Sequence, residues 1–313
     1  MLRLRVLSPT AKTEDALAVL RAQPGATHVV VLRGAAVEPA GDVIEADVAR
    51  EAVDELLGAL CALDLDHVGG ITLDELDTAL SDAADRAEQA APGDGADAVV
   101  WDELLARTGE DSRLTTTFLA FLTIACLLAA VGVVTDSPIT VVGAMVVGPE
   151  FGPLAALAVG LVLRRFDLAG RAALALLAGF PLAMLITAGG ALLGKATGLI
   201  GADAMSAADN VDFVYQVGPF SLVVALLAGA AGMLAVTSAR SAVLVGVFIS
   251  VTTVPAAGYV VVAAVLGEWG RSVGSLVQLA VNIVGIVFAA ALVLVVRRKS
   301  WAPSAANRPL SPG

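Results

Sequence analysis

The chain has 313 residues, a mean hydropathy of +0.85 and only 16% charged residues, which is too apolar for a soluble globular protein of ordinary composition. Residues 1–110 hold 22 acidic and 8 basic residues, whereas residues 111–313 hold 8 and 11, so the net charge of −11 divides into −14 and +3. We therefore expect an acidic domain in water followed by a domain in the lipid bilayer.

The start of the chain, its acidic surface and its cysteines argue against a secretory signal, a nucleic-acid partner and a metal site. Residues 1–33 alternate charges with short apolar runs and contain no hydrophobic stretch typical of a secretory signal, so we expect a cytoplasmic N-terminus. The acidic surface argues against nucleic acid as a partner, because its phosphates would be repelled. Cys61 and Cys126 lack metal-ligand spacing; we expect no metal site and interpret both as buried apolar side chains.

Residues 1–80 have the pattern of a small α+β domain. Alternating or β-branched runs predict four strands, and helical spacing predicts two helices, in the chain order Leu2–Ser8, Glu14–Arg21, Thr27–Arg33, Asp42–Asp47, Val48–Leu63 and Val68–Leu73. This βαββαβ order predicts a ferredoxin-like sandwich, which could serve a regulatory role or simply as a solubilising and oligomerising cap. The acidic residues from Asp64 to Asp77 lack the spacing of an EF-hand and favour a solvated face over a calcium site.

Residues 81–112 connect this domain to the apolar part. Residues 81–97 are small and polar and predict a linker, and Ala98–Arg107 resumes helical spacing with Trp101, as expected of an amphipathic juxtamembrane helix. The transmembrane domain is expected over residues 113–299, and residues 300–313 are expected to form a flexible C-terminal tail.

The apolar part predicts a polytopic α-helical membrane protein. Six spans of about the ~20 residues that cross a bilayer are expected at 114–134, 138–163, 168–194, 219–237, 241–266 and 275–296. Basic residues concentrate in the connections on the N-terminal side, namely Arg113, Arg164, Arg165, Arg171, Arg240, Arg297, Arg298 and Lys299, whereas the other side has Lys195 and Arg271. By the positive-inside rule both termini are cytoplasmic. The longest external loop is then Lys195–Gly218, with Asp203, Asp209 and Asp212.

The second span contains an interruption and an acidic residue. Gly148, Pro149, Gly152 and Pro153 fall near mid-membrane, where each proline removes a backbone donor, so we expect a broken helix sheltered by protein or water. Glu150 lies between the prolines, where an unpaired carboxylate costs several kcal/mol. It could cap the second half-helix or form part of an ion or substrate site.

The fifth span repeats this pattern in weaker form. Gly246–Pro255 again leads from glycine to proline. When the two segments are aligned with Gly246 matched to Gly143, Thr252 and Thr253 are matched to Pro149 and Glu150. Two halves of three spans each would have opposite orientations, so the pattern predicts a 3+3 inverted repeat of the kind many transporters have. Frequent glycine and proline in membrane helices could also produce the match by chance.

Three further polar residues are candidates for the same site. Asp136 lies at the outer start of the second span, and Gln278 and Asn282 lie one helical turn apart in the last span. Interhelical hydrogen bonding and contact with a solute are both open for Gln278 and Asn282. Small residues such as those in Gly229–Gly232 favour close helix packing, and with the compact bundle they predict a homo-oligomer.

Together these motifs resemble a known family. Asp136-Ser137, Val142–Met145, Gly148-Pro149 with Gly152-Pro153, Gly246–Pro255 and Asn282 are similar to the bacterial and archaeal membrane proteins grouped as domain of unknown function 389. The resemblance implies the membrane architecture and no assigned activity. Family members usually have an apolar residue after the first proline and two adjacent prolines at the end of the fifth-span motif, so Glu150 and the single Pro255 depart from the family pattern.

The sequence favours a channel or secondary transporter for a small ion or solute with a cytoplasmic regulatory domain. Glu150 would bind a cation or proton, and backbone near Gly148–Pro153 and Thr252–Pro255 would complete the site. The alternative is a membrane-embedded sensor or scaffold that transmits a signal without transport. We expect no cofactor and no enzyme: the chain has no nucleotide-binding glycine-lysine motif, and its membrane half has no histidine and no serine with a plausible base.

Overall fold

The computed structural model describes residues 1–76, 78–91, 93, 98–201, 210–211, 214, 218–238 and 253–301. The chain forms two compact units, one built from Met1–Leu104 and the other from most of the residues that follow. The boundary agrees with the change in charge and hydropathy along the sequence, because an acidic and an apolar segment cannot share one core.

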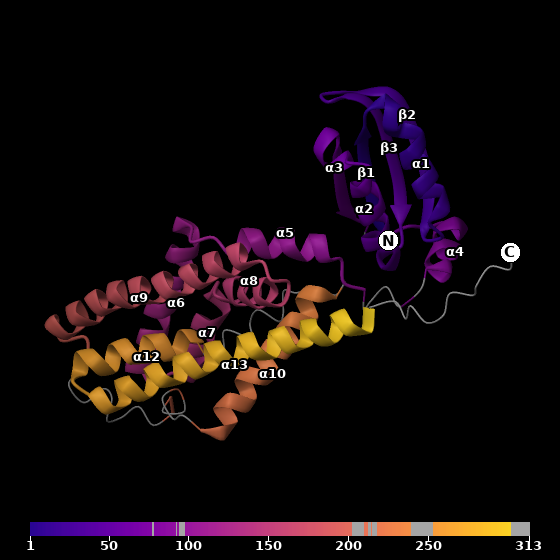
Figure 1. Ribbon diagram of the computed structural model, residues 1–313. Helices are drawn as coiled ribbons and strands as arrows, with labels where there is room; N and C mark the ends of the chain where they lie inside the picture. The colour runs from indigo at the N-terminus through magenta and orange to yellow at the C-terminus, as the bar shows by residue number, and fades with distance from the viewer. Residues whose placement is uncertain are drawn as a thin grey trace. The chain divides into compact units, whose positions relative to one another are not determined.

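A four-stranded sheet with the strand order β2-β3-β1-β4 forms the centre of the first unit, and all its neighbouring strands are antiparallel (Figure 1). Its elements in chain order are β1 (Leu2–Ser8), α1 (Thr13–Ala22), β2 (Ala26–Val37), β3 (Ala40–Val48), α2 (Val53–Ala62), α3 (Leu65–Val68), β4 (Gly70–Glu75) and α4 (Asp82–Ala90). Short 3₁₀ turns at Thr10–Lys12 and Arg50–Ala52 precede α1 and α2. The expected succession of four strands and two main helices is present.

Helices α1 and α2 share a hydrophobic core with one face of this sheet. Alternate residues of β1 point into the core and are at most 2% exposed: Leu2, Leu4 and Val6. The helices contribute buried leucines at helical spacing, among them Leu17, Leu20, Leu56 and Leu60. The alternation that predicted the strand and the helical spacing that predicted the helices therefore also identify their buried faces.

Two expectations for this unit need correction. Cys61 is exposed, not buried, because Leu56, Leu57 and Leu60 occupy the core-facing side of α2 and Cys61 follows on its outer side. Cys126 is buried, as expected. Residues 82–90, within the predicted linker, form helix α4. Ser81 caps α4 by accepting a hydrogen bond from the Ala83 N–H at 3.1 Å. The buried residues of α4 are alanines, so the sequence shows only a weak apolar pattern for this helix.

Asp54 on α2 gives this unit a pH-dependent stability. Burial raises the pKa of Asp54 from 3.8 to about 6, although its Oδ1 accepts a hydrogen bond from the Trp101 N–H at 3.1 Å. The folded state therefore binds more protons than the unfolded state between pH ~4 and ~6, and the free energy of unfolding falls as pH rises through this window. Asp54→Asn is expected to remove that fall and to stabilise the chain at pH 7 by about 1–2 kcal/mol, a figure reduced for partial exposure.

Urea unfolding of the full chain in detergent micelles measures this effect. Trp101 fluorescence reports on the neighbourhood of Asp54 when Trp269 and Trp301 are replaced by phenylalanine. Asp15→Asn, at an exposed site on α1, is the matched control and should keep the wild-type pH dependence. A pH dependence that persists unchanged in Asp54→Asn would contradict the assignment.

The second unit consists of apolar helices, which indicate a membrane protein. Of the described helices, four are long and apolar enough to cross a membrane: α6 (Thr116–Val134), α9 (Phe166–Ala196), α10 (Pro219–Thr237) and α13 (Trp269–Trp301). A fifth candidate span is the bent pair α7 (Pro138–Val147) and α8 (Phe151–Val162), and α12 (Thr253–Leu266) is a shorter apolar helix. Helix α5 (Trp101–Asp111) precedes them, close to the expected juxtamembrane position.

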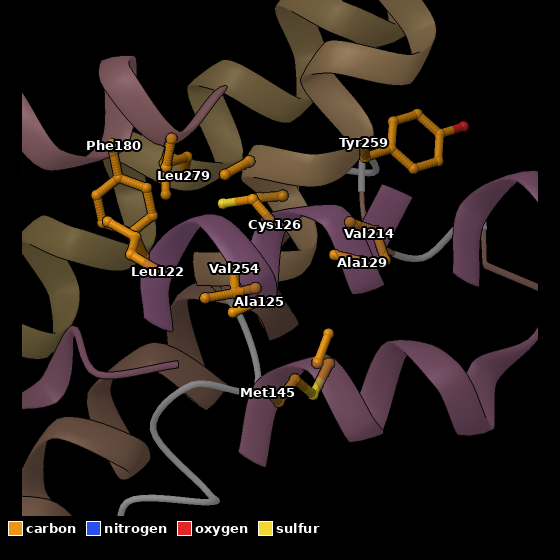
Figure 2. Packing of buried hydrophobic residues seen from close by; sticks show 14 of the residues in the cluster. Leu122, Ala125, Cys126, Ala129, Met145, Phe180, Val214, Val254, Tyr259 and Leu279 are labelled. Carbon is orange, nitrogen blue, oxygen red and sulfur yellow. The ribbon is translucent and has the colours of Figure 1, made fainter. Parts of the chain in front are cut away.

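Helix α6 packs against α7, α9 and α12, and α13 packs against α12 and α8. Figure 2 shows Ala125 and Cys126 of α6 among Phe180 of α9, Val254 of α12 and Leu279 of α13. These buried residues form one hydrophobic cluster. The cluster holds α12 and α13 in place beside the bent pair.

Several sequence-based expectations fall outside the described residues. These are Thr252 and the rest of the fifth-span motif before residue 253, the external acidic residues Asp203, Asp209 and Asp212, most of residues 92–97, and the tail from residue 302.

Candidate functional site

The predicted interruption of the second span is present between α7 and α8. Helix α7 ends at Val147, α8 begins at Phe151, and the two helices are bent by 54°. Gly148 has extended backbone, with φ −64° and ψ 127°, and Pro149 has no N–H to continue the ladder of α7. The last carbonyls of α7 therefore lack donors that a continuous helix would supply.

The second proline of the motif plays a different part from the first. Pro153 is the third residue of α8, where its missing N–H would have had no partner within the helix anyway. Pro255 lies in the described part of α12, Thr253–Leu266. Pro153 therefore starts a helix, and among the described residues the break itself lies at Gly148 and Pro149.

Glu150 lies at this break and is completely buried. It precedes the first residue of α8, its side chain makes no capping hydrogen bond to that helix, and its exposed fraction is 0%. The hydroxyl of Thr253, the first residue of α12, donates a hydrogen bond to Glu150 Oε1 at 2.6 Å. A carboxyl group at the break between α7 and α8 is thus joined to α12.

Two hydrogen bonds fix how α12 lies along α13. The Ser272 hydroxyl donates to the carbonyl of Val260 and the Ser275 hydroxyl donates to the carbonyl of Ala256, each at 2.9 Å, so the two helices run antiparallel. Continuing this register by one turn brings Gln278 to the level of Thr253. The polar face of α13 therefore approaches the end of α12 that contacts Glu150.

Gln278 and Asn282 are both buried on α13. Gln278 is 5% exposed and Asn282 is 0% exposed, and Gln278 Nε2 donates to Asn282 Oδ1 at 3.3 Å. Gln278 Oε1 is a buried acceptor with no hydrogen-bond partner among the described residues. The structure therefore brings buried oxygen atoms from the break, from α12 and from α13 toward one level of the bundle.

Asp136 has a different environment. Its carboxylate accepts hydrogen bonds from the Asn210 N–H, the Asn210 side-chain amide and the Val211 N–H, at 3.0, 2.7 and 3.2 Å. The ten residues of α7 separate it in the chain from the break, about 15 Å along the helix. In the structure this carboxylate fixes a connection between helices.

Asp136→Ala is expected to lower the free energy of unfolding by about 1–3 kcal/mol, because it removes the acceptor of several backbone and side-chain donors. Thermal unfolding in detergent measures the loss. Any flux through the reconstituted protein should keep its wild-type cation dependence, whereas a changed dependence would place Asp136 in the site.

One neighbour of the break, Asp111 at the end of α5, was not expected from the sequence. A Cβ atom on Gly152 would lie only 2.7 Å from the Asp111 Cβ, so the glycine permits α5 to touch the first turn of α8. Burial raises the pKa of Asp111, and Arg107 partly opposes that rise. The contact depends on glycine at 152, which composition and hydropathy could not indicate.

The folded arrangement defines the class: a multi-helix membrane-type domain with one buried acidic break, joined to a small antiparallel α+β domain. Residues 145–288 match the family model described as domain of unknown function (DUF389). This match confirms, over residues 145–288, the resemblance found in the sequence. No curated protein and no solved structure matches the chain.

Proposed function

We propose that the protein is a channel or secondary transporter for a small ion or solute, with a proton or monovalent cation as the favoured species. The observation that carries the proposal is the buried hydrogen bond between Thr253 and Glu150 at the break of the α7–α8 pair. Ionisable groups at membrane depth usually mark ion or substrate paths, because burying them is costly. A single carboxylate carries one negative charge, which balances a monovalent cation better than a divalent one.

The donor atoms around the break support a cation site. The terminal carbonyls of α7, the Thr253 hydroxyl, the Glu150 carboxyl and Gln278 Oε1 are oxygen donors of the kind that alkali cations and protons bind. Non-helical backbone at membrane depth is tolerated where protein or a water-filled cavity surrounds it. The resemblance to the family does not extend to a carboxylate after the first proline, so we propose the carboxyl site for this chain and not for the family.

The proposal includes the finer architecture expected from the sequence. We infer six spans with a 3+3 inverted repeat, cytoplasmic termini and a homo-oligomer in the cell membrane. The sheet order and the succession of elements in residues 1–75 support a ferredoxin-like fold for the first unit, and we propose a regulatory role for it. Because the membrane half has no histidine, we propose transport without catalysis by the helices and without a cofactor.

Flux into liposomes that contain the purified full-length protein tests this function. Protons, Na⁺, K⁺ and an uncharged solute such as glycerol are presented in turn, with protein-free vesicles as the control. The proposal expects protein-dependent flux of at least one monovalent cation. Vesicles that stay tight to the whole panel would contradict transport and favour the sensor or scaffold.

A further inference from the structure

Three side chains of the first unit form a chain of hydrogen bonds that the sequence analysis did not consider. His28 Nδ1 lies 2.8 Å from Asp47 Oδ2, and His28 Nε2 lies 2.9 Å from the Ser81 hydroxyl oxygen. The residues come from β2, β3 and the capping position of α4, respectively. Carboxylate, imidazole and hydroxyl in this order are the parts of a hydrolytic triad.

The surrounding hydrogen bonds select the protonation pattern that such a triad needs. Asp47 Oδ1 also accepts from Arg3 Nε at 3.2 Å, and its other oxygen, Oδ2, faces His28 Nδ1, which donates to it in the tautomer that a triad requires. In that tautomer Nε2 is the acceptor, and the Ser81 hydroxyl donates to it. The Ser81 oxygen accepts from the Ala83 N–H at 3.1 Å, which leaves its own proton available for His28.

The backbone at His28 is unusual in a way that serves this geometry. His28 has φ +49°, in the left-handed region that non-glycine residues seldom adopt, and the register of β2 against β3 shifts between Thr27 and Val30. Such bulges redirect a side chain out of the regular strand pattern. The His28 side chain is 38% exposed, so a substrate can reach it from solvent.

Helix α4 supplies hydrogen-bond donors beside Ser81. Its first residue, Asp82, directly follows the serine, and backbone N–H groups at a helix start can stabilise negative charge that develops on a carbonyl oxygen. The carboxylates of Asp82 and Asp85 lie in the same turn and would repel an anion. The site therefore favours uncharged or cationic esters over anionic ones.

The geometry points to Ser81 as a nucleophile for acyl transfer from such esters. The Ser81 oxygen attacks the acyl carbon while His28 Nε2 takes its proton; the ester C–O bond then breaks and the leaving alkoxide takes that proton. Water, deprotonated by His28, attacks the acyl-serine, releases the acid and restores the hydroxyl. Asp47 is a positioning residue that holds the imidazole in the required tautomer.

Labelling with an uncharged alkyl fluorophosphonate tests the site in the full-length protein in detergent. The Ser81 oxygen bonds to phosphorus, fluoride leaves, and peptide mass spectrometry locates the adduct. We expect labelling of Ser81 to fall at least ten-fold in His28→Gln and to be absent in Ser81→Asn, which keeps the helix cap. Thr78→Ala, at an exposed hydroxyl nearby, should label like the wild type.

The positioning role of Asp47 has its own readout. Asp47→Asn should lose most of the labelling, and Asp47→Glu, which restores a carboxylate, should recover part of it. Thermal unfolding of each variant separates loss of the site from loss of the fold. Absence of a Ser81 adduct in folded wild type, or equal labelling in folded His28→Gln, would overturn the inference.

Discussion

Glu150→Gln is expected to reduce cation flux at least about ten-fold, equivalent to about 1.4 kcal/mol or more, while the helix packing stays intact. Glutamine has nearly the same shape and keeps a side-chain oxygen that can accept the hydrogen bond from the Thr253 hydroxyl. In the wild type this bond joins Thr253 Oγ1 to Glu150 Oε1 at 2.6 Å. The substitution replaces the buried carboxylate of the described membrane helices by an uncharged amide, so the negative charge is lost and one carboxylate oxygen becomes an NH2 group. Flux of the selected cation in proteoliposomes measures the loss.

The control for this change is a carboxylate at the surface. Glu268, in the turn between α12 and α13, is exposed, so Glu268→Gln alters the same charge without touching the bundle interior. It should leave flux within about two-fold of the wild type. Equal flux in Glu150→Gln and Glu268→Gln would remove Glu150 from the permeation path.

Gly258→Leu is expected to destabilise the helix bundle by about 3 kcal/mol or more and to abolish flux. A Cβ on Gly258 would lie 2.7 Å from the Ala129 Cβ and 3.0 Å from the Ala130 N, so a larger side chain must push α12 away from α6. Thr253 lies five residues earlier on α12 and would move away from Glu150. Thermal unfolding and flux measured on the same preparation show both effects.

Gly189→Leu on α9 is the matched control. A Cβ at Gly189 meets no atom within 4 Å, so leucine there should preserve both stability and flux. A Gly258→Leu protein with wild-type stability would contradict the close approach of α12 and α6.

Local sequence patterns were sufficient for much of the fold. Strand β1 spans the predicted residues, Leu2–Ser8, because alternation along a half-buried strand is strict. The break after Val147 follows from Gly148 and Pro149, since proline cannot continue the hydrogen bonds of α7. These features depend on neighbours in the chain.

The site was only partly predictable. Alignment of the two glycine-to-proline motifs matches Thr253 with Glu150 as equivalent positions, which does not itself predict a contact. The structure joins these two residues by a hydrogen bond, and the repeat stays a prediction. The contact of Asp111 with Gly152 and the approach of Ser81 to His28 could not be predicted. They depend on how segments far apart in the chain pack, which no local periodicity encodes.

We expect the Glu150 carboxyl to bind the cation at the break. Infrared difference spectra of the reconstituted protein, recorded on exchange of Na⁺, K⁺ or protons, measure this directly through the carboxyl bands. A cation-induced carboxyl band is expected that is absent in Glu150→Gln and retained in Glu268→Gln. Identical difference spectra for the wild type and Glu150→Gln with every cation would contradict it.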